Sequence, residues 1–186
     1  MNYRDAIKEW KRVAENFLDA RESIYKEAID LTIDSLKEGH KILVFGNGGS
    51  AAQAQHFAAE LVNKFLKIRP PIRAISLTTD TSVLTSIAND SSYDSVFSRQ
   101  IDALGEKGDI ALGLSTSGNS PNVVEAMKAA KVKGLVTIAL TGKDGGKLHS
   151  HVDCLLDIPS EETPRIQEVH ILLLHLLAQE IEDKLG

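Results

Sequence analysis

The sequence is poor in cysteine, in basic charge and in long apolar runs, and each shortage excludes a class of protein. Cys154 is the single cysteine, so no internal disulfide or cysteine-based metal cluster can form, which fits a reducing compartment. The formal net charge of -5 argues against a general nucleic-acid or membrane-surface binder, because such proteins present a basic face. The longest apolar run, residues 169–178, is interrupted by two histidines and is too short to span a bilayer. We therefore expect a cytoplasmic protein with no nucleic-acid or membrane partner.

The composition present is that of an ordinary folded protein. The 186 residues are 42% hydrophobic and 25% charged, which predicts one domain over residues 1–186 with a sizeable core. Residues 1–39 show apolar side chains at helical spacing and no proline or glycine before Gly39, so they predict two amphipathic helices. We expect this segment to be an arm that packs on the remaining core, residues 40–186, or on another copy of the chain.

From residue 40 onward, short apolar runs alternate with helical patterns. This alternation is typical of βαβ units, and it predicts an α/β fold with a five-stranded parallel sheet covered by helices on both faces, a doubly wound three-layer arrangement. The expected strands are residues 42–45, 74–77, 110–114, 136–140 and 155–158, and the clearest helices are residues 51–65, 121–133 and about 164–184.

The first candidate site is the loop Gly46–Ser50, between an expected strand and an expected helix. Its glycines let the backbone approach a ligand, and the free amides of the helix N-terminus favour an anion or a sugar oxygen. The loop lacks both the dinucleotide-binding spacing and the lysine of a phosphate-binding P-loop. The alternative is a tight structural turn in which Ser50 caps the helix.

The second candidate site is the loop Ser115–Ser120, which also follows a strand and precedes a helix. Four hydroxyl groups in six residues, with helix amides behind them, form a neutral cradle for a phosphate. The alternative is a polar loop with a serine cap. Because both loops follow strands of a parallel sheet, we expect them at its carboxyl edge, where ligands bind in such folds.

Three further polar groups stand out. His56 and Glu60 are four residues apart on the helix after the first loop, so they face the same way, although the spacing alone fits an ordinary surface pair. Gln167 and His175 lie broadly on one side of the apolar last helix, where they need a partner, either a structural one or a metal ion. The Asn89–Asp90 pair, at the end of a helical stretch, has little meaning alone.

The chain resembles the phosphoheptose isomerases, which are sugar isomerase (SIS) domain proteins. The resemblance covers nearly the whole chain, and the stretches that show it are FGNGGSAAQAQHFAAEL, SIANDSSYDSVFSRQ, GLSTSGNSPNV and TPRIQEVHILLLH. It implies a five-stranded SIS fold, a homotetramer with shared active sites and one zinc ion per subunit. It also implies conversion of sedoheptulose 7-phosphate to D-glycero-D-manno-heptose 7-phosphate, a precursor of surface polysaccharide. In such an assembly we expect residues 1–39 to form the oligomer.

The resemblance also implies roles for individual residues. One departure is Pro164, where some family members have an aspartate whose role cannot be transferred. The implied metal ligands are His56, Glu60, Gln167 and His175. The implied sugar and phosphate contacts are Asn47, Gly48, Gly49, Asn89, Asp90, Ser115, Thr116, Ser117, Ser120 and Gln167.

An aldose–ketose exchange moves a proton between C1 and C2 through an enediol, which requires a base that can return the proton and a second acid/base group. We expect Glu60 to be the base and His175 its partner. Two alternatives exist. One is a non-catalytic SIS scaffold that binds the replication initiator protein, although such a scaffold has serine at the position of Glu60 and lacks His175. The other is a sensor of sugar phosphates that does not turn them over.

Overall fold

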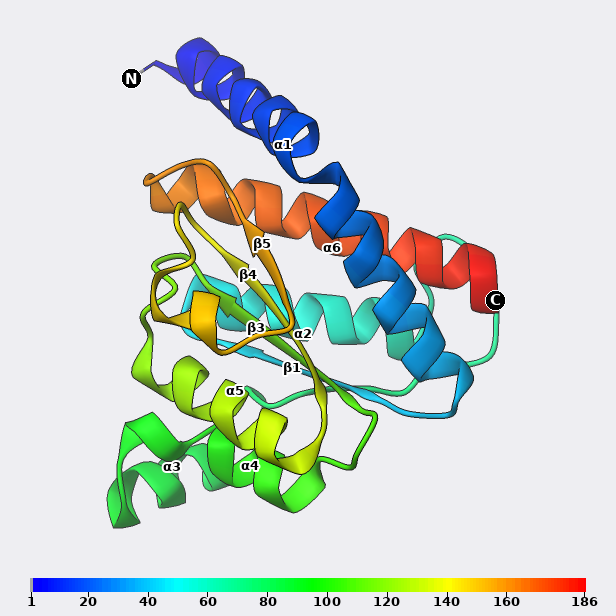
Figure 1. Cartoon of the computed structure of the whole chain (residues 1–186), viewed down its shortest axis with the longest axis vertical. Coiled ribbons are helices and arrows are strands. Elements are labelled where there is room, and N and C mark those ends of the chain that lie inside the picture. The colour runs from blue at the N-terminus through cyan, green and yellow to red at the C-terminus, as the bar shows by residue number, and fades with distance from the viewer. Residues whose placement is uncertain (1) are drawn as a thin grey trace.

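The computed structural model describes residues 2–186, so only Met1 of the predicted arm lies outside it. The chain forms a three-layer α/β structure (Figure 1). The strands are β1 (Ile42–Gly46), β2 (Ala74–Ser76), β3 (Ile110–Ser115), β4 (Val136–Thr141) and β5 (Cys154–Asp157). The helices are α1 (Tyr3–Lys37), α2 (Gly49–Val62), α3 (Thr81–Asp90), α4 (Ser98–Leu104), α5 (Pro121–Lys133) and α6 (Thr163–Leu185), with short 3₁₀ turns η1 (Tyr93–Ser95) and η2 (Gly146–Ser150).

All five strands are parallel, in the spatial order β2-β1-β3-β4-β5. The predicted SIS-type fold, with five parallel strands between helices, is therefore confirmed. The central strands β1 and β3 are buried at every position, because helices cover both of their faces. The chain leaves β1 toward β2 on one side and returns to β3 on the other, which creates the switch point where ligands bind in such sheets.

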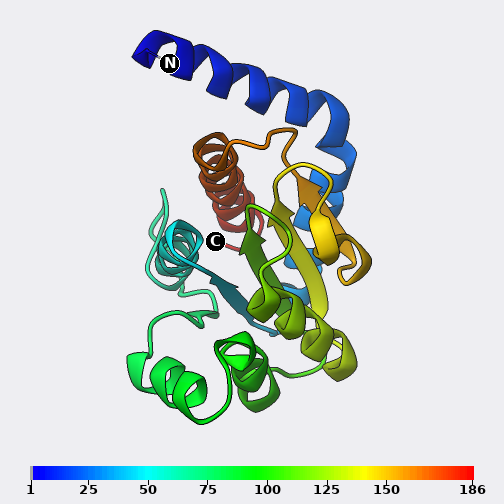
Figure 2. The same ribbon diagram turned by 90° about the vertical axis from the view of Figure 1, so that its left-hand side faces the viewer.

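The two faces of the sheet bury two separate apolar clusters. Alternation along β1 decides which side chain joins which cluster: Ile42 and Val44 pack with α1, α2 and α6, whereas Leu43 and Phe45 pack with α4 and α5. Figure 2 shows the helices on their opposite sides of the sheet. The layers place the beginnings of α2 and α5 at the same edge of the sheet, where both predicted loops lie.

The N-terminal segment differs from the expectation in one respect. The two predicted helices are one continuous 35-residue helix, α1, whose ribbon changes direction along its length (Figures 1 and 2). No proline or glycine interrupts the segment, so the backbone hydrogen bonds continue throughout. The part of α1 nearer its C-terminal end packs on α6 and β5. The first part lies beside the start of α6, where Arg165 donates to the carbonyl of Ala6, and it buries Val13 and Phe17.

Helix α4 is not among the predicted elements. It is a seven-residue helix whose Ile101 is buried in the cluster with Phe97 and Leu77, so its place depends on tertiary packing. Within residues 2–186, none of the helices combines the length with the apolar composition that a membrane span requires.

Candidate functional site

The loop after β1 is shaped by close backbone approach. Gly46 lies so near β3 that a Cβ there would meet the carbonyl oxygen of Leu114 at 2.8 Å. Gly48 has a φ of 55° and is the N-cap residue of α2. Ser50 lies buried inside the first turn of α2, so the alternative in which it caps the helix is wrong. Because Gly48 has no side chain to cap the helix, the first amides of α2 have no side-chain cap.

Asn47 is held by a partner that the sequence did not reveal. The side-chain amides of Asn47 and Asn122 donate to each other's oxygen atoms at 2.8 and 2.9 Å. Asn122 is buried in the first turn of α5, and the hydroxyl of Tyr93 reaches Asn47 Oδ1 at 3.5 Å. This reciprocal pair joins the loop after β1 to the helix after the second loop. Because the two asparagines are 75 residues apart, no local pattern identifies the pair.

The loop after β3 presents hydroxyl groups at the start of α5. Ser115 Oγ and Ser120 Oγ are 3.0 Å apart, and Ser120 makes no side-chain cap of α5. Ser120 therefore occupies the N-cap position of α5, but its hydroxyl bonds Ser115 and not the helix amides. Gly118 has a φ of 64°, and a Cβ there would overlap the carbonyl group of Gly145. Only glycine therefore allows the loop backbone to approach Gly145 this closely.

Part of the same loop lines a cavity of about 230 Å³. Thr116 and Ser117 line it together with Ser160, Thr163, Lys143 and Glu161. The ammonium group of Lys143 pairs with Glu161 at 3.2 Å, so its charge is already balanced. An anion here would be held chiefly by hydroxyl and backbone N–H groups, the chemistry that the loop sequence predicts.

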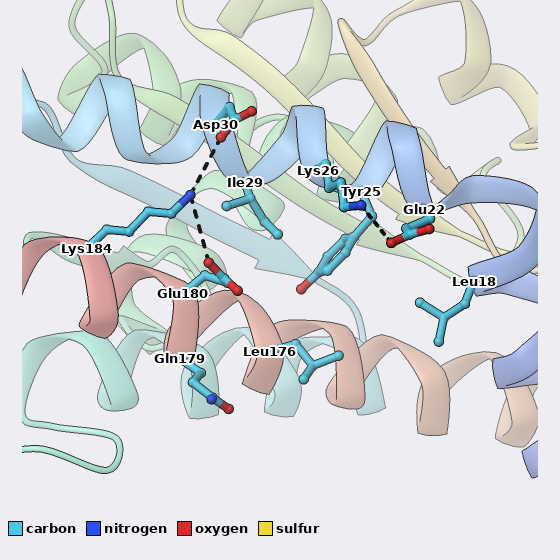
Figure 3. A pocket seen from close by; sticks show the side chains of 10 residues that line it. All are labelled: Leu18, Glu22, Tyr25, Lys26, Ile29, Asp30, Leu176, Gln179, Glu180 and Lys184. Carbon is cyan, nitrogen blue, oxygen red and sulfur yellow. Dashed lines mark ion pairs between the residues drawn. The ribbon is translucent and has the colours of Figure 1, made fainter.

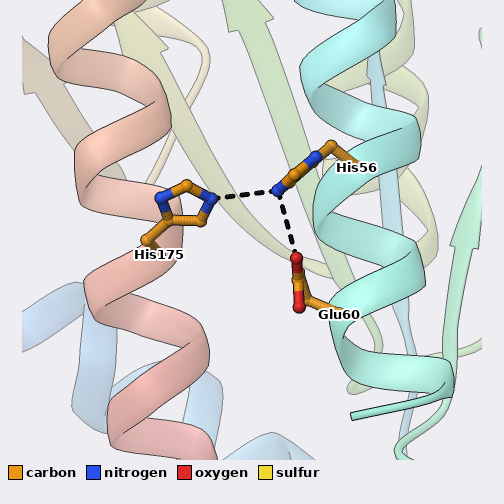
Figure 4. A group of neighbouring side chains, drawn as sticks. All are labelled: His56, Glu60 and His175. Atoms are coloured by element: carbon orange, nitrogen blue, oxygen red, sulfur yellow. Dashed lines mark hydrogen bonds and ion pairs between the residues drawn. The ribbon is translucent and has the colours of Figure 1, made fainter. Parts of the chain in front are cut away.

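His56, Glu60 and His175 meet between α2 and α6 (Figure 4). His56 Nε2 lies 2.9 Å from His175 Nε2 and 3.1 Å from Glu60 Oε1. Helices α2 and α6 pack side by side, and this packing joins residues 119 positions apart. The three side chains are exposed or half-buried, so solutes can reach them.

The donor atoms of this group suit a divalent cation. A neutral imidazole nitrogen has either one hydrogen or one lone pair. If the two Nε2 atoms and the Glu60 oxygen all present lone pairs to one point, a proton or a cation must lie between them. Two imidazole nitrogens and a carboxylate oxygen are the usual ligands of catalytic zinc with an open position. The residues present therefore fit the zinc ion that the resemblance implies.

Gln167 lies elsewhere in the structure. Its side-chain amide lies against Gly49, where a Cβ would come within 2.5 Å of Gln167 Nε2. Its backbone carbonyl accepts a hydrogen bond from Gln53 Nε2 at 2.7 Å. Eight residues of helix separate Gln167 from His175, a rise of about 12 Å. Gln167 therefore lies at the glycine loop, consistent with a sugar contact, and within residues 2–186 its side chain makes no hydrogen bond to the histidine–glutamate group.

Asn89 and Asp90 end α3, and both are exposed. Asn89 Nδ2 donates to Asp90 Oδ1 at 2.7 Å. Neither side chain is hydrogen-bonded to the two loops in the part of the chain that the structure describes. Tyr93, three residues further on, is the residue of this segment that contacts Asn47.

A second histidine of α6, His170, has a structural role. It is fully buried, its Nε2 donates to the carbonyl of Thr141 at 3.0 Å, and its Nδ1 has no hydrogen-bond partner. Burial lowers the pKa of His170 from 6.5 to about 4, because the charged imidazolium loses hydration, and the hydrogen bond to Thr141 offsets only part of this. His170 is therefore neutral at physiological pH.

A cavity of about 500 Å³ lies between α1 and α6, away from both loops (Figure 3). Its walls hold both acidic and basic side chains, which already pair: Lys26 with Glu22, and Lys184 with Asp30 and Glu180. Balanced pairs leave no excess of positive charge for a phosphate, so this cavity is a poor candidate for the sugar-phosphate site.

Comparison with known proteins agrees with this geometry. Residues 3–142, most of the chain, match the model of the SIS domain family. A phosphoheptose isomerase of Thermodesulfovibrio yellowstonii is 53% identical over 97% of this chain and 90% of its own length.

Solved structures agree as well. The phosphoheptose isomerase of Neisseria gonorrhoeae superposes with a TM-score of 0.91 at 45% identity, covering 97% of this chain and 96% of that one. The enzyme of Francisella tularensis gives 0.92 at 35% identity over 98% and 100%. These relatives are isomerases, which confirms the predicted enzyme class and does not favour the scaffold alternative. The chain belongs to the SIS-domain family of phosphoheptose isomerases.

Proposed function

We propose that the chain converts sedoheptulose 7-phosphate to D-glycero-D-manno-heptose 7-phosphate, in the synthesis of heptose precursors for surface polysaccharide. A seven-carbon sugar with phosphate at one end and the reacting carbonyl at the other needs two separate groups of residues. The loop Ser115–Ser120 supplies anion-binding groups, and Glu60 and His175 supply acid/base groups. The observation on which the proposal chiefly depends is the meeting of Glu60 and His175 across α2 and α6.

In the proposed reaction Glu60 removes the proton from C1 of the ketose and returns it to C2. His175 moves the second proton, from the oxygen on C1 to the carbonyl oxygen on C2. The enediol is thereby converted to the aldose with no net gain or loss of protons. General acid–base catalysis of this kind requires each group within hydrogen-bond reach of the proton it moves. The phosphate stays bound to Ser115, Thr116, Ser117 and Ser120, while Asn47, Gly48, Gly49, Asn89, Asp90 and Gln167 contact the sugar.

We further propose that each subunit binds one zinc ion. His56, Glu60 and His175 would hold it, with Gln167 as a fourth ligand only if its side chain turns away from Gly49. Zinc bound there would supply a Lewis acid for the carbonyl oxygen. Calorimetric titration of chelator-treated protein should show one zinc site per chain, lost in His175→Ala and kept in the exposed-histidine control His149→Ala. Equal zinc binding by both variants would contradict the assignment.

The proposal includes a homotetramer with shared active sites, formed in part by the arm, residues 1–39. Three large apolar side chains of α1 support an interface there, since Tyr3, Ile7 and Leu18 are 73%, 61% and 44% exposed. We place the enzyme in the cytoplasm, a proposal supported by the buried free thiol of Cys154. Sedimentation of the wild type and of Ile7→Glu tests the tetramer, because a charge in an apolar interface should dissociate it.

Incubation of the purified protein with sedoheptulose 7-phosphate in D₂O tests the reaction. NMR should show the aldose appearing, with deuterium at C2 because a base-bound proton exchanges with solvent. Chelator should stop turnover, and added zinc should restore it. No aldose under any metal condition would contradict the proposed reaction.

A further inference from the structure

The end of α6 contains a buried carboxylate that binds the segment after α2. Glu182 is 1% exposed, and its two oxygens accept the backbone N–H groups of Phe65, Leu66 and Lys67, each at 2.8 Å. Burial opposes the charge, but these three hydrogen bonds and the nearby Arg69 outweigh it and lower the pKa of Glu182. Glu182 is therefore a fixed negative charge.

Arg69 is the buried cation that faces Glu182. Its Nε lies 3.2 Å from Glu182 Oε1, an ion pair in which both side chains are 1% exposed. The two terminal nitrogens of Arg69 donate to the carbonyls of Leu61 and Glu60, both at 2.8 Å. These carbonyls belong to the last turn of α2, whose backbone oxygens lack helical partners and form the negative end of the helix dipole.

The same pair reaches both proposed acid/base residues. Arg69 binds the backbone of Glu60 directly. Glu182 binds the amide of Phe65, whose ring stacks on the ring of His175 with centroids 5.5 Å apart and planes 22° apart. Glu182 follows His175 by seven residues, so both lie on the same face of α6. One buried ion pair thus contacts both the backbone of Glu60 and the residue whose ring stacks on His175.

We propose that the buried Glu182–Arg69 pair is a positioning element of the active site, which fixes Glu60 on α2 and His175 on α6 at the separation that proton transfer requires. The proposal rests on the roles proposed above for Glu60 and His175. Neither Glu182 nor Arg69 touches the substrate. They hold the last turn of α2 and the Phe65 ring in place, and these in turn position the side chains of Glu60 and His175.

Glu182→Gln is the central variant, and the chain offers a matched control. The amide keeps the size of the side chain and one acceptor oxygen, but it removes the charge that faces Arg69. Asp183, the next residue of α6, pairs with Lys67 of the same segment, although this pair is exposed. Asp183→Asn therefore makes the same chemical change against the same segment, outside the buried network.

We expect Glu182→Gln to lower kcat by about 10- to 100-fold, the size of effect caused by a misplacement of about 1 Å. KM for the sugar phosphate should stay within about twofold, because the loop Ser115–Ser120 is untouched, and the pH profile of kcat should shift. Asp183→Asn should match the wild type in all three. Measurements are made on variants whose circular dichroism shows the native fold.

Wild-type kcat and an unchanged pH profile in Glu182→Gln would overturn the positioning role, as would an equal loss in Asp183→Asn. If Glu182→Gln fails to fold, Phe65→Leu decides, because it leaves the ion pair in place and removes only the ring stacked on His175. It should lower kcat without raising KM, and a normal kcat would overturn the proposal. An inactive wild type would instead contradict the proposed function.

Discussion

Two regions of the site are assembled in different ways: the loops Gly46–Ser50 and Ser115–Ser120, and the side-chain group of His56, Glu60 and His175 between α2 and α6. Each loop is built from consecutive residues, and its shape follows from backbone features such as the positive φ of Gly48 and Gly118. The group of His56, Glu60 and His175 exists only because two helices pack together. The loops offer amides and hydroxyls that suit an anion, whereas the helices offer groups that can move protons.

We therefore expect binding and chemistry to be separable in this site. The shape of each loop depends on its glycines and on close contacts such as Asn47 with Asn122 and Gly118 with Gly145. The side-chain group depends on how α2 packs against α6, and in our proposal the buried Glu182–Arg69 pair sets their separation. Substitutions in the helices should therefore act on kcat, and substitutions in the loops should act on KM.

The largest effect is expected from Glu60→Gln, which removes the proposed base and keeps its size. We expect kcat to fall by about 10²- to 10⁴-fold, the contribution of a positioned acid/base group, while KM stays within a few-fold. Steady-state kinetics with the ketose phosphate measures both. Glu125→Gln on α5, where an exposed glutamate pairs with Lys128, is the acid-to-amide control and should behave as the wild type. Near-normal turnover by Glu60→Gln would show that the group of His56, Glu60 and His175 does not perform the chemistry.

The two histidines of α6 should differ in their effects, because His170 should affect stability rather than turnover. Its folded-state pKa is lowered to about 4, so between pH 6.5 and 4 the unfolded chain binds a proton that the folded chain does not. The contribution of His170 to the free energy of unfolding is therefore fully present above pH 6.5. It falls as the pH drops, and the loss reaches about 3 kcal/mol at pH 4.

Urea unfolding from pH 7 to pH 4 measures the effect. His170→Gln cannot take up this proton, so its stability should fall less steeply over the same range, whatever its stability at neutral pH. The exposed-histidine control His149→Gln should keep the wild-type slope. Identical slopes for all three proteins would show that His170 is not the group responsible.

A smaller effect is expected from Ser120→Ala in the loop after β3. The variant loses one hydroxyl of the proposed phosphate cradle, and a hydrogen bond to a charged group contributes about 1.5–3 kcal/mol. KM and the Kd of inorganic phosphate should therefore rise about tenfold or more, with kcat within about twofold. Ser150→Ala is the control, because its hydroxyl bonds the carbonyl of Lys147 and no group of the loop Ser115–Ser120. A loss of kcat with unchanged KM would reverse the assignment of the two regions.

The sequence predicts those parts of the fold that are encoded locally. Alternation of apolar runs and helices identified the five strands, and glycine and hydroxyl residues at strand ends identified both loops, because neighbouring residues determine these features. Helix α4 was missed because its place depends on buried contacts with distant residues such as Leu77. The Asn47–Asn122 and Arg69–Glu182 pairs were missed for the same reason: each joins residues at least 75 positions apart, and no spacing along the chain indicates them.

The metal-ligand set illustrates the limit within one helix. Gln167 and His175 lie on the same side of α6, as the rotation per residue about the helix axis predicts. The resemblance assigns both residues to one ion. In the structure the rise of the helix separates them, so that Gln167 lies at Gly49 and His175 at His56. Angle follows from sequence spacing, but which part of α2 each side chain faces depends on how the two helices pack.

The smallest expected effect is the coupling between the two regions. If the loops bind and the helix group reacts, Ser120→Ala should weaken inorganic phosphate binding by the same factor in the wild type and in Glu60→Gln. Mutations at separate sites without shared partners add to within about 0.5 kcal/mol, so the coupling free energy from calorimetric Kd values should be no larger. The pair Asn47→Ala and Asn122→Ala is the positive control, because these side chains bond each other and should couple more strongly. A coupling between Ser120 and Glu60 well above that limit would mean that loop and helices respond as one unit, and the division between binding and chemistry would then be wrong.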